Sequence, residues 1–172
     1  MEGLSLMNDK YIMCILGNDR HKFRRLVELS ARVAEATNKS LIVQAGHNKY
    51  DLKNGEQFAF SEKNVFMELI NKSCYVVSHC GSGSLRRILR SEKKSIILPR
   101  LRKYDEHIDD HQIQIAEEYS KYRRCYLPDD YCQIEINLNK CLGALENYEY
   151  NFDEAFEHDL SIEIAKVVES WL

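Results

Sequence analysis

A glycine-rich turn in the middle of the chain has residue types that could hold a phosphate group. The apolar run Cys74–Ser78 leads into His79, and Gly81–Ser84 then precede a short basic segment of helical pattern. Glycines let the backbone approach a phosphate closely, and a helix start offers free N–H groups and a positive dipole end. A tight strand-to-helix turn can also need glycine for steric reasons alone, so both interpretations stay open.

A second polar segment places imidazoles among carboxylates. His107 and His111 lie close in sequence to Glu106, Asp109 and Asp110. Histidine and aspartate clusters can bind metal ions, and carboxylates also accept hydrogen bonds from sugar or ribose hydroxyls. Asp110 and His111 could instead only cap the helix that follows them. Metal binding, sugar or nucleotide contact, and capping all remain open at this point.

Two further polar turns follow apolar runs. Gly17 and Asn18 come after the run at residues 11–16, and Gln44, Gly46 and His47 end the run at residues 40–44. Each turn could be a substrate loop or plain turn chemistry. Because several polar turns would share one sheet edge, we expect them to form a site together.

The elements that must position these turns alternate along the chain. We expect strands at residues 11–16, 40–44, 58–60, 74–78, 95–99 and 124–127, and helices near 23–34, 64–71 with Ser61 as N-cap, 85–91, 110–122, 131–147 and 152–172. This alternation predicts an α/β fold with a parallel sheet covered on both faces. In such sheets ligands bind beyond the carboxyl ends of the strands.

Composition narrows the class of protein. A length of 172 residues with 44% hydrophobic content fits one domain with a real core, and the net charge of -3 argues against a nucleic-acid binder. The six cysteines form no CxxC pair, and the sequence shows no signal peptide and no apolar run long enough to cross a bilayer. We therefore expect a reduced, soluble, cytoplasmic protein. A basic stretch at residues 86–103 suits phosphates or an anionic membrane surface, or is a solvated face.

Three of these segments carry a family resemblance. Val77–Ser84, then Ile96–Arg100, then Glu106–Gln112 closely resemble the C-terminal domain of glycosyltransferase family 28. The match is closest to free-standing bacterial exopolysaccharide subunits of the PssE/EpsF type, which are related to the catalytic subunit of the dolichol-linked N-acetylglucosaminyltransferase. The resemblance implies a Rossmann-like sheet, the donor-binding half of a GT-B glycosyltransferase, with residues 1–172 as a single nucleotide-sugar-binding domain.

The resemblance also implies an activity. The chain would bind a UDP-sugar and transfer its sugar, with inversion, to a glycan on a polyprenyl diphosphate. It is too short to include the acceptor half, so a membrane-anchored subunit would supply that half and recruit the chain to the inner face of the membrane. Such enzymes need no cofactor and no bound metal for chemistry.

Site residues follow by position. The resemblance implies that Gly81–Ser84 cradle the diphosphate, that residues 106–112 contact the sugar and diphosphate, that the turn after the first strand lines the cleft towards the partner, and that Phe60 lies by the uracil. The expected donor-binding residues are Gly17, Asn18, Phe60, Gly81, Ser82, Gly83, Ser84, Arg100, Glu106, His107, Asp109, Asp110, His111 and Gln112. Transfer needs a general base, for which His79 or His21 could serve, unless the base lies on the partner.

One departure keeps other functions open. Relatives commonly carry a glutamate in the helix after the glycine turn, whereas Leu85–Arg90 has no acid and Arg87 takes that place. A non-catalytic nucleotide-sugar-binding or regulatory subunit is therefore an alternative, and an unrelated enzyme such as a sugar-nucleotide epimerase is another. Residues 152–172 have helical spacing on an acidic background and could pack on their own domain or dock on a partner.

Overall fold

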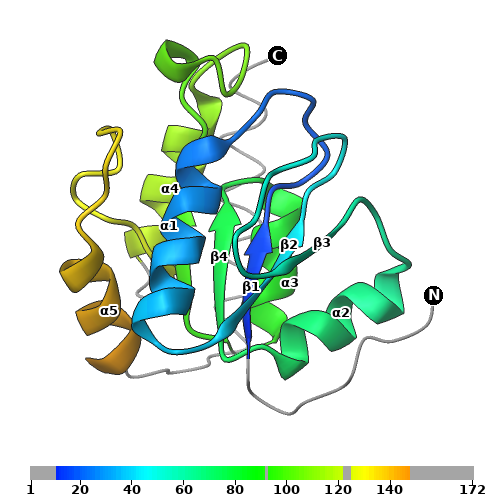
Figure 1. Ribbon diagram of the computed structural model, residues 1–172. Coiled ribbons are helices and arrows are strands. Elements are labelled where there is room, and N and C mark those ends of the chain that lie inside the picture. Colours follow the sequence, from blue (N-terminus) through cyan, green and yellow to red (C-terminus); the bar gives the residue numbers. More distant parts are fainter. Residues whose placement is uncertain (1–10, 92, 122–124, 148–172) are drawn as a thin grey trace.

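The computed structural model describes residues 11–91, 93–121 and 125–147, and it shows one wholly parallel sheet (Figure 1). The strands are β1 (Tyr11–Ile15), β2 (Ser40–Gln44), β3 (Glu56–Phe58), β4 (Tyr75–His79), β5 (Ser95–Leu98) and β6 (Cys125–Tyr126). Their order in the sheet is β3-β2-β1-β4-β5-β6. The predicted α/β fold with a Rossmann-like parallel sheet is confirmed.

Helices cover both faces of this sheet (Figure 1). They are α1 (Arg24–Ala36), α2 (Lys63–Lys72), α3 (Ser82–Arg90), α4 (His111–Lys121) and α5 (Leu138–Asn147), with a short 3-10 turn at Arg102–Tyr104. The helices α1 and α5 share one buried cluster with the sheet, and α2, α3 and α4 share the other. None of these described helices is long and apolar enough to cross a bilayer.

Strand β1 shows why the apolar runs are continuous. Ile12 and Cys14 pack towards α1 and α5, whereas Met13 and Ile15 pack towards the helices on the other face. Successive side chains of a strand point to opposite faces, so a central parallel strand needs apolar residues at every position.

The structure differs in detail from several sequence predictions, and α3 begins at Ser82 rather than at residue 85. β3 begins two residues earlier than expected, and α2 is capped at Glu62 with no side-chain cap bond, so Ser61 is not its N-cap. The helix expected at residues 131–147 covers only Leu138–Asn147. The carbonyls of Tyr131 and Gln133 accept hydrogen bonds from Arg25 instead of from the next helical turn. The expected helix at residues 152–172 lies outside the described residues.

The order of the strands creates a switch point between β1 and β4. From β1 the chain moves outward through β2 to β3, and it then returns to the other side of β1 to form β4. Adjacent strands whose connections leave in opposite directions open a space at their carboxyl ends, which is where open α/β sheets bind ligands.

Candidate functional site

The turns after β1 and β4 meet around one histidine ring. The Nδ1 atom of His79 lies 3.2 Å from the carbonyl oxygen of Ile15. A Cβ atom added to Gly17 would lie 2.5 Å from the Nε2 atom of His79, and one added to Gly81 would lie 2.3 Å from the same atom. Gly17 also has a φ of +77°, in the region that favours glycine. Both glycines are therefore required by the packing of His79.

His79 is held in its neutral form. Burial, followed by the charge of Arg100, lowers the pKa of His79 from 6.5 to about 4. The carbonyl of Ile15 can only accept, so the proton lies on Nδ1 and the lone pair on Nε2. A base with so low a pKa takes up protons poorly at neutral pH. The geometry favours a positioning role for His79 between the two glycine turns.

The N-terminus of α3 is open. Its N-cap residue is Gly81, and no side chain of the described residues caps this helix end. The N–H groups of Ser84 and Leu85 both bond to the Gly81 carbonyl, while an added Cβ at Gly83 would meet no atom within 4 Å apart from its own neighbours in the helix. Gly83 is exposed, and Ser82 and Ser84 are half-buried. This end can therefore accept an anion with its N–H groups and hydroxyls.

Two buried side chains fix the turn after β1. Gln44 accepts a hydrogen bond from the Gly17 N–H at 2.9 Å and donates to the Gly17 carbonyl at 3.0 Å. Arg100 donates to the carbonyls of Leu16 and His21, each at 2.9 Å. Gln44 was expected only as part of a polar strand end, and its role as a clamp on Gly17 depends on the β1–β2 pairing.

Arg100 is placed differently from the sequence prediction. It is fully buried, its Nη atoms donate to backbone carbonyls, and its guanidinium lies 4.8 Å from the centre of the Phe23 ring. We expected this side chain to face the diphosphate. Its charge instead lies behind the turns, where it holds them in place.

Glu106 is also turned inward, towards a residue that the sequence did not single out. Its carboxylate forms two hydrogen bonds with Arg25, at 2.7 and 2.9 Å, and accepts a third from the Leu101 N–H at 3.0 Å. Arg25 and Glu106 are both buried. The remaining N–H groups of Arg25 donate to the carbonyls of Pro99, Tyr131 and Gln133, so all five of its donors are satisfied.

Gln112 connects two of the strand-end turns. Its side-chain oxygen accepts hydrogen bonds from the N–H groups of Cys80 and Arg100, both at 3.2 Å, and the residue is buried. Like Glu106, Gln112 was expected to touch a ligand. In the structure Gln112 sets the spacing of the turns that follow β4 and β5, and Glu106 links the turn after β5 to Arg25 on α1.

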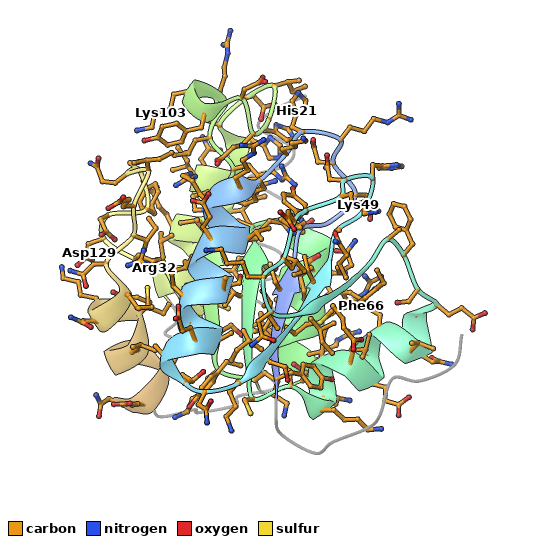
Figure 2. The ribbon with its side chains drawn as sticks, viewed as in Figure 1. His21, Arg32, Lys49, Phe66, Lys103 and Asp129 are labelled. Carbon is orange, nitrogen blue, oxygen red and sulfur yellow. The ribbon has the colours of Figure 1, made fainter. Side chains whose placement is uncertain are left out.

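A line of alternating imidazoles and carboxylates joins the turn after β1 to the loop before α4. His21 Nδ1 lies 2.7 Å from Asp19, and the other oxygen of Asp19 lies 3.2 Å from His107 Nε2. His107 Nδ1 lies 3.0 Å from Asp109, which also contacts His111 Nδ1. Figure 2 shows His21 at the end of the molecule to which the strands point.

Hydrogen bonds keep both carboxylates of this line ionised. Burial acts to raise the pKa of Asp19, but hydrogen bonds from His21 and the charges of Arg100 and His107 outweigh it and hold the pKa below its ordinary value. At Asp109 the small effect of burial is likewise outweighed by hydrogen bonds from the ring and N–H of His111, which lower the pKa. The carboxylates of Asp19 and Asp109 can therefore bind a positive charge or accept hydrogen bonds from hydroxyl groups.

The other expected site residues lie at the edges of this region. Asn18 is exposed, and the Asp110 carboxylate accepts a hydrogen bond from the Arg102 N–H at 2.7 Å, so it caps the 3-10 turn. Phe60 is 52% exposed and lies edge-on to the ring of His47, at 5.0 Å, on the β2–β3 side of the sheet. Phe60, which the sequence predicts to lie by the uracil, is therefore placed beside β2 and β3 and not around His79.

A groove of about 880 Å³ lies elsewhere on the domain. Its walls come from α1, from the start of β2, and from residues 51–54 and 134–136, and it includes none of the strand-end turns at β1, β4 and β5. We place the candidate site at the strand ends because the open helix end, the glycine turns and the imidazole–carboxylate line all meet there.

Comparison with known proteins gives consistent results. UDP-N-acetylglucosamine transferase subunit ALG13 of Debaryomyces hansenii is 32% identical over 93 residues, which make up 54% of this chain and 41% of that protein. The glycosyltransferase SnogD from Streptomyces nogalater superposes with a TM-score of 0.56 at 15% identity, over 98% of this chain and 42% of that one. A solution structure of ALG13 superposes with a TM-score of 0.53 at 18% identity, over 89% and 95% of the two chains.

The chain therefore spans less than half the length of the curated relative and of SnogD. The structural likenesses have low sequence identity and show the fold alone. The sequence model of the glycosyltransferase family 28 C-terminal domain matches residues 12–155, which is most of the chain. The chain belongs to the glycosyltransferase family 28 C-terminal domain family.

Proposed function

We propose that this domain binds the nucleotide-sugar donor, a UDP-sugar, of an inverting glycosyltransferase. The observation that carries the proposal is the open N-terminus of α3 at the switch point between β1 and β4. The N–H groups there and the positive end of the helix dipole suit a diphosphate, and Gly83 leaves room for it. The name of the curated relative, a UDP-N-acetylglucosamine transferase subunit, supports a UDP-linked donor.

In this proposal the acceptor hydroxyl attacks the anomeric carbon of the donor as UDP leaves. Negative charge grows on the leaving diphosphate, where the N–H groups of Gly81, Ser82 and Gly83 and the serine hydroxyls stabilise it. The buried Arg100 acts from behind through its charge and by fixing the turns. The donor sugar lies towards His107, Asp109 and His111, whose carboxylate can accept bonds from sugar hydroxyls. This chemistry needs no metal ion.

His21 is a better general base than His79. It is 34% exposed, and Asp19 accepts a hydrogen bond from its Nδ1 at 2.7 Å, which leaves Nε2 to accept a proton. A carboxylate that orients an imidazole in this way is common in base catalysis. His79 is buried and its pKa falls to about 4. The partner remains a second possible source of the base.

The acceptor side belongs to a second polypeptide in this proposal. The relative's name describes it as a subunit. We assign the acceptor, a glycan on a polyprenyl diphosphate in polysaccharide synthesis of the PssE/EpsF type, to a membrane-anchored partner. That partner would hold this cytoplasmic chain at the inner face of the membrane.

One observation favours a second candidate, a non-catalytic nucleotide-sugar-binding subunit. Arg87 takes the place at which a glutamate was expected from the family resemblance. Its side chain is exposed, and its guanidinium lies 5.5 Å from the centre of the Phe66 ring. An arginine held there supplies no acceptor for ribose hydroxyls.

Isothermal titration of the purified chain with UDP, UDP-glucose, UDP-galactose, UDP-N-acetylglucosamine and UDP-glucuronate tests the proposal, with and without the membrane partner. We expect one UDP-sugar to bind best, and sugar transfer only when the partner is present. Binding without transfer in the complete complex would favour the non-catalytic subunit. No binding of any of these ligands, with the partner present, would contradict donor binding.

A further inference from the structure

We propose that His107, Asp109 and His111 form a binding site for a divalent transition-metal ion, with Asp19 orienting His107 from behind. The proposed function places the donor sugar beside these same three residues, but ion binding does not depend on that proposal. The three ligands lie within five residues of one another, in the loop between β5 and α4 and at the start of α4.

The ligand atoms already converge. One ligand atom from each of the three residues lies within 4.8 Å of the other two. His107 Nδ1 is 3.0 Å from Asp109 Oδ1, and the same oxygen contacts His111 Nδ1. In a tetrahedral site with bonds of about 2.0–2.1 Å, the ligand atoms lie roughly 3.3 Å apart. Small side-chain rotations would therefore bring an ion into contact with all three.

The surroundings of His107 call for a cation. Its Nε2 faces a carboxylate oxygen of Asp19 at 3.2 Å, and its Nδ1 faces Asp109. A neutral imidazole has one proton, so donation from Nε2 to Asp19 leaves the Nδ1 lone pair facing the Asp109 carboxylate and also the Asp109 N–H, which lies 3.3 Å away. A metal ion between Nδ1 and the Asp109 carboxylate would bind both. An imidazole that binds a metal through one nitrogen and a carboxylate through the other is a common arrangement in metal sites.

The donor set selects the class of ion. Two imidazole nitrogens and one carboxylate suit Zn²⁺, Co²⁺, Ni²⁺ or Cu²⁺, whereas Mg²⁺ and Ca²⁺ prefer oxygen ligands alone. The side chain of Asp109 is 52% exposed and that of His111 is 29% exposed, so an ion could enter and keep a water ligand. The positive end of α4 opposes a cation, but Asp19, Asp109 and Asp110 place three carboxylates in these two loops.

Such an ion would add a second link between two loops that Arg100 already joins, since Arg100 donates to the carbonyls of His21 and Glu106. Asp19 lies in the turn after β1, and the three ligands lie after β5, so an ion held on His107 would also hold Asp19. We therefore expect metal binding to raise the melting temperature, because an ion that binds only the folded state stabilises it.

Titration with Co²⁺, followed by visible absorption and by thermal unfolding, tests the site without UDP or a partner. We expect a nitrogen- and oxygen-ligated spectrum and a higher melting temperature for the natural chain. Asp109→Asn and His111→Ala should abolish both, and Asp19→Asn should weaken binding by roughly 10–100-fold, as loss of an outer-shell partner does. His47→Ala removes an exposed histidine at another turn and should behave as the natural chain does.

Three results would overturn the proposal. The first is a sulfur-ligated spectrum, which would assign the ion to the cysteines. The second is equal Co²⁺ affinity in the natural chain and in Asp109→Asn and His111→Ala, provided that both variants unfold cooperatively. The third is the absence of Co²⁺ binding to the natural chain. Because these measurements use no nucleotide, they leave the proposed donor binding to its own test.

Discussion

Replacing Glu106 by glutamine separates a positioning role from direct ligand contact. The sequence predicts that Glu106 touches the donor. In the structure its carboxylate is buried against Arg25, with contacts of 2.7 and 2.9 Å, and also accepts a bond from the Leu101 N–H. Glu106→Gln keeps the shape of the side chain, but it removes the negative charge and replaces one acceptor oxygen with a donor. Arg25 is then left buried without a counter-charge.

The expected loss of stability is large. Removing one partner of a buried ion pair typically costs about 3–5 kcal/mol, because the remaining charge is uncompensated. The side chains of Arg25 and Glu106 are only 2% and 4% exposed, so solvent screens this pair little. Arg25 also bonds to the carbonyls of Tyr131 and Gln133, so the segment before α5 should loosen with it.

Urea unfolding of the natural chain, Glu106→Gln and Glu28→Gln measures this effect. Glu28 is exposed on α1, so its replacement should change the free energy of unfolding by no more than about 0.5 kcal/mol. We expect Glu106→Gln to unfold at a clearly lower urea concentration. Unchanged stability of Glu106→Gln, together with loss of UDP-sugar binding, would refute the positioning role and restore direct contact.

Two further predictions concern the glycine turns and His79. Gly83→Val adds a side chain in open space, so we expect a nearly unchanged melting temperature but about tenfold or greater loss of UDP affinity. Gly81→Ala should instead cost about 1–3 kcal/mol of stability, because its Cβ would lie 2.3 Å from His79 Nε2. Full UDP affinity in Gly83→Val would argue against a diphosphate at α3. Because the pKa of His79 is lowered to about 4 in the folded chain, between pH 6.5 and about 4 this ring is protonated in the unfolded chain but neutral in the folded chain. The contribution of His79 to the free energy of unfolding therefore falls by about 3 kcal/mol as the pH drops through that range. Urea unfolding at several pH values should show a steeper loss below pH 6.5 in the natural chain than in His79→Asn, and parallel curves would contradict the buried neutral ring.

The parallel sheet could be predicted because its signal is local. The run of β1 and residues 74–77 are apolar at every position, which is typical of strands buried on both faces. The glycine turns were predicted for the same reason. That Gly17 and Gly81 both pack on His79 could not be predicted, because this contact depends on the pairing of β1 with β4.

The direction in which the polar side chains point could not be predicted from the sequence. Arg100, Glu106 and Gln112 were expected to face a ligand, whereas the structure turns all three towards backbone groups or a buried partner. Arg25 was missed because a charged residue on a helix is usually solvated. Its partner Glu106 is far away in sequence, and no spacing rule connects the two.

The most direct test of the central claim is the ¹H–¹⁵N spectrum of the chain during titration with UDP. The account predicts that the largest shifts occur at the amides of Gly81–Ser84 and of Gly17, around the open end of α3. Shifts confined to the groove along α1, at residues 51–54 and 134–136, would contradict it and move the nucleotide site away from the strand ends.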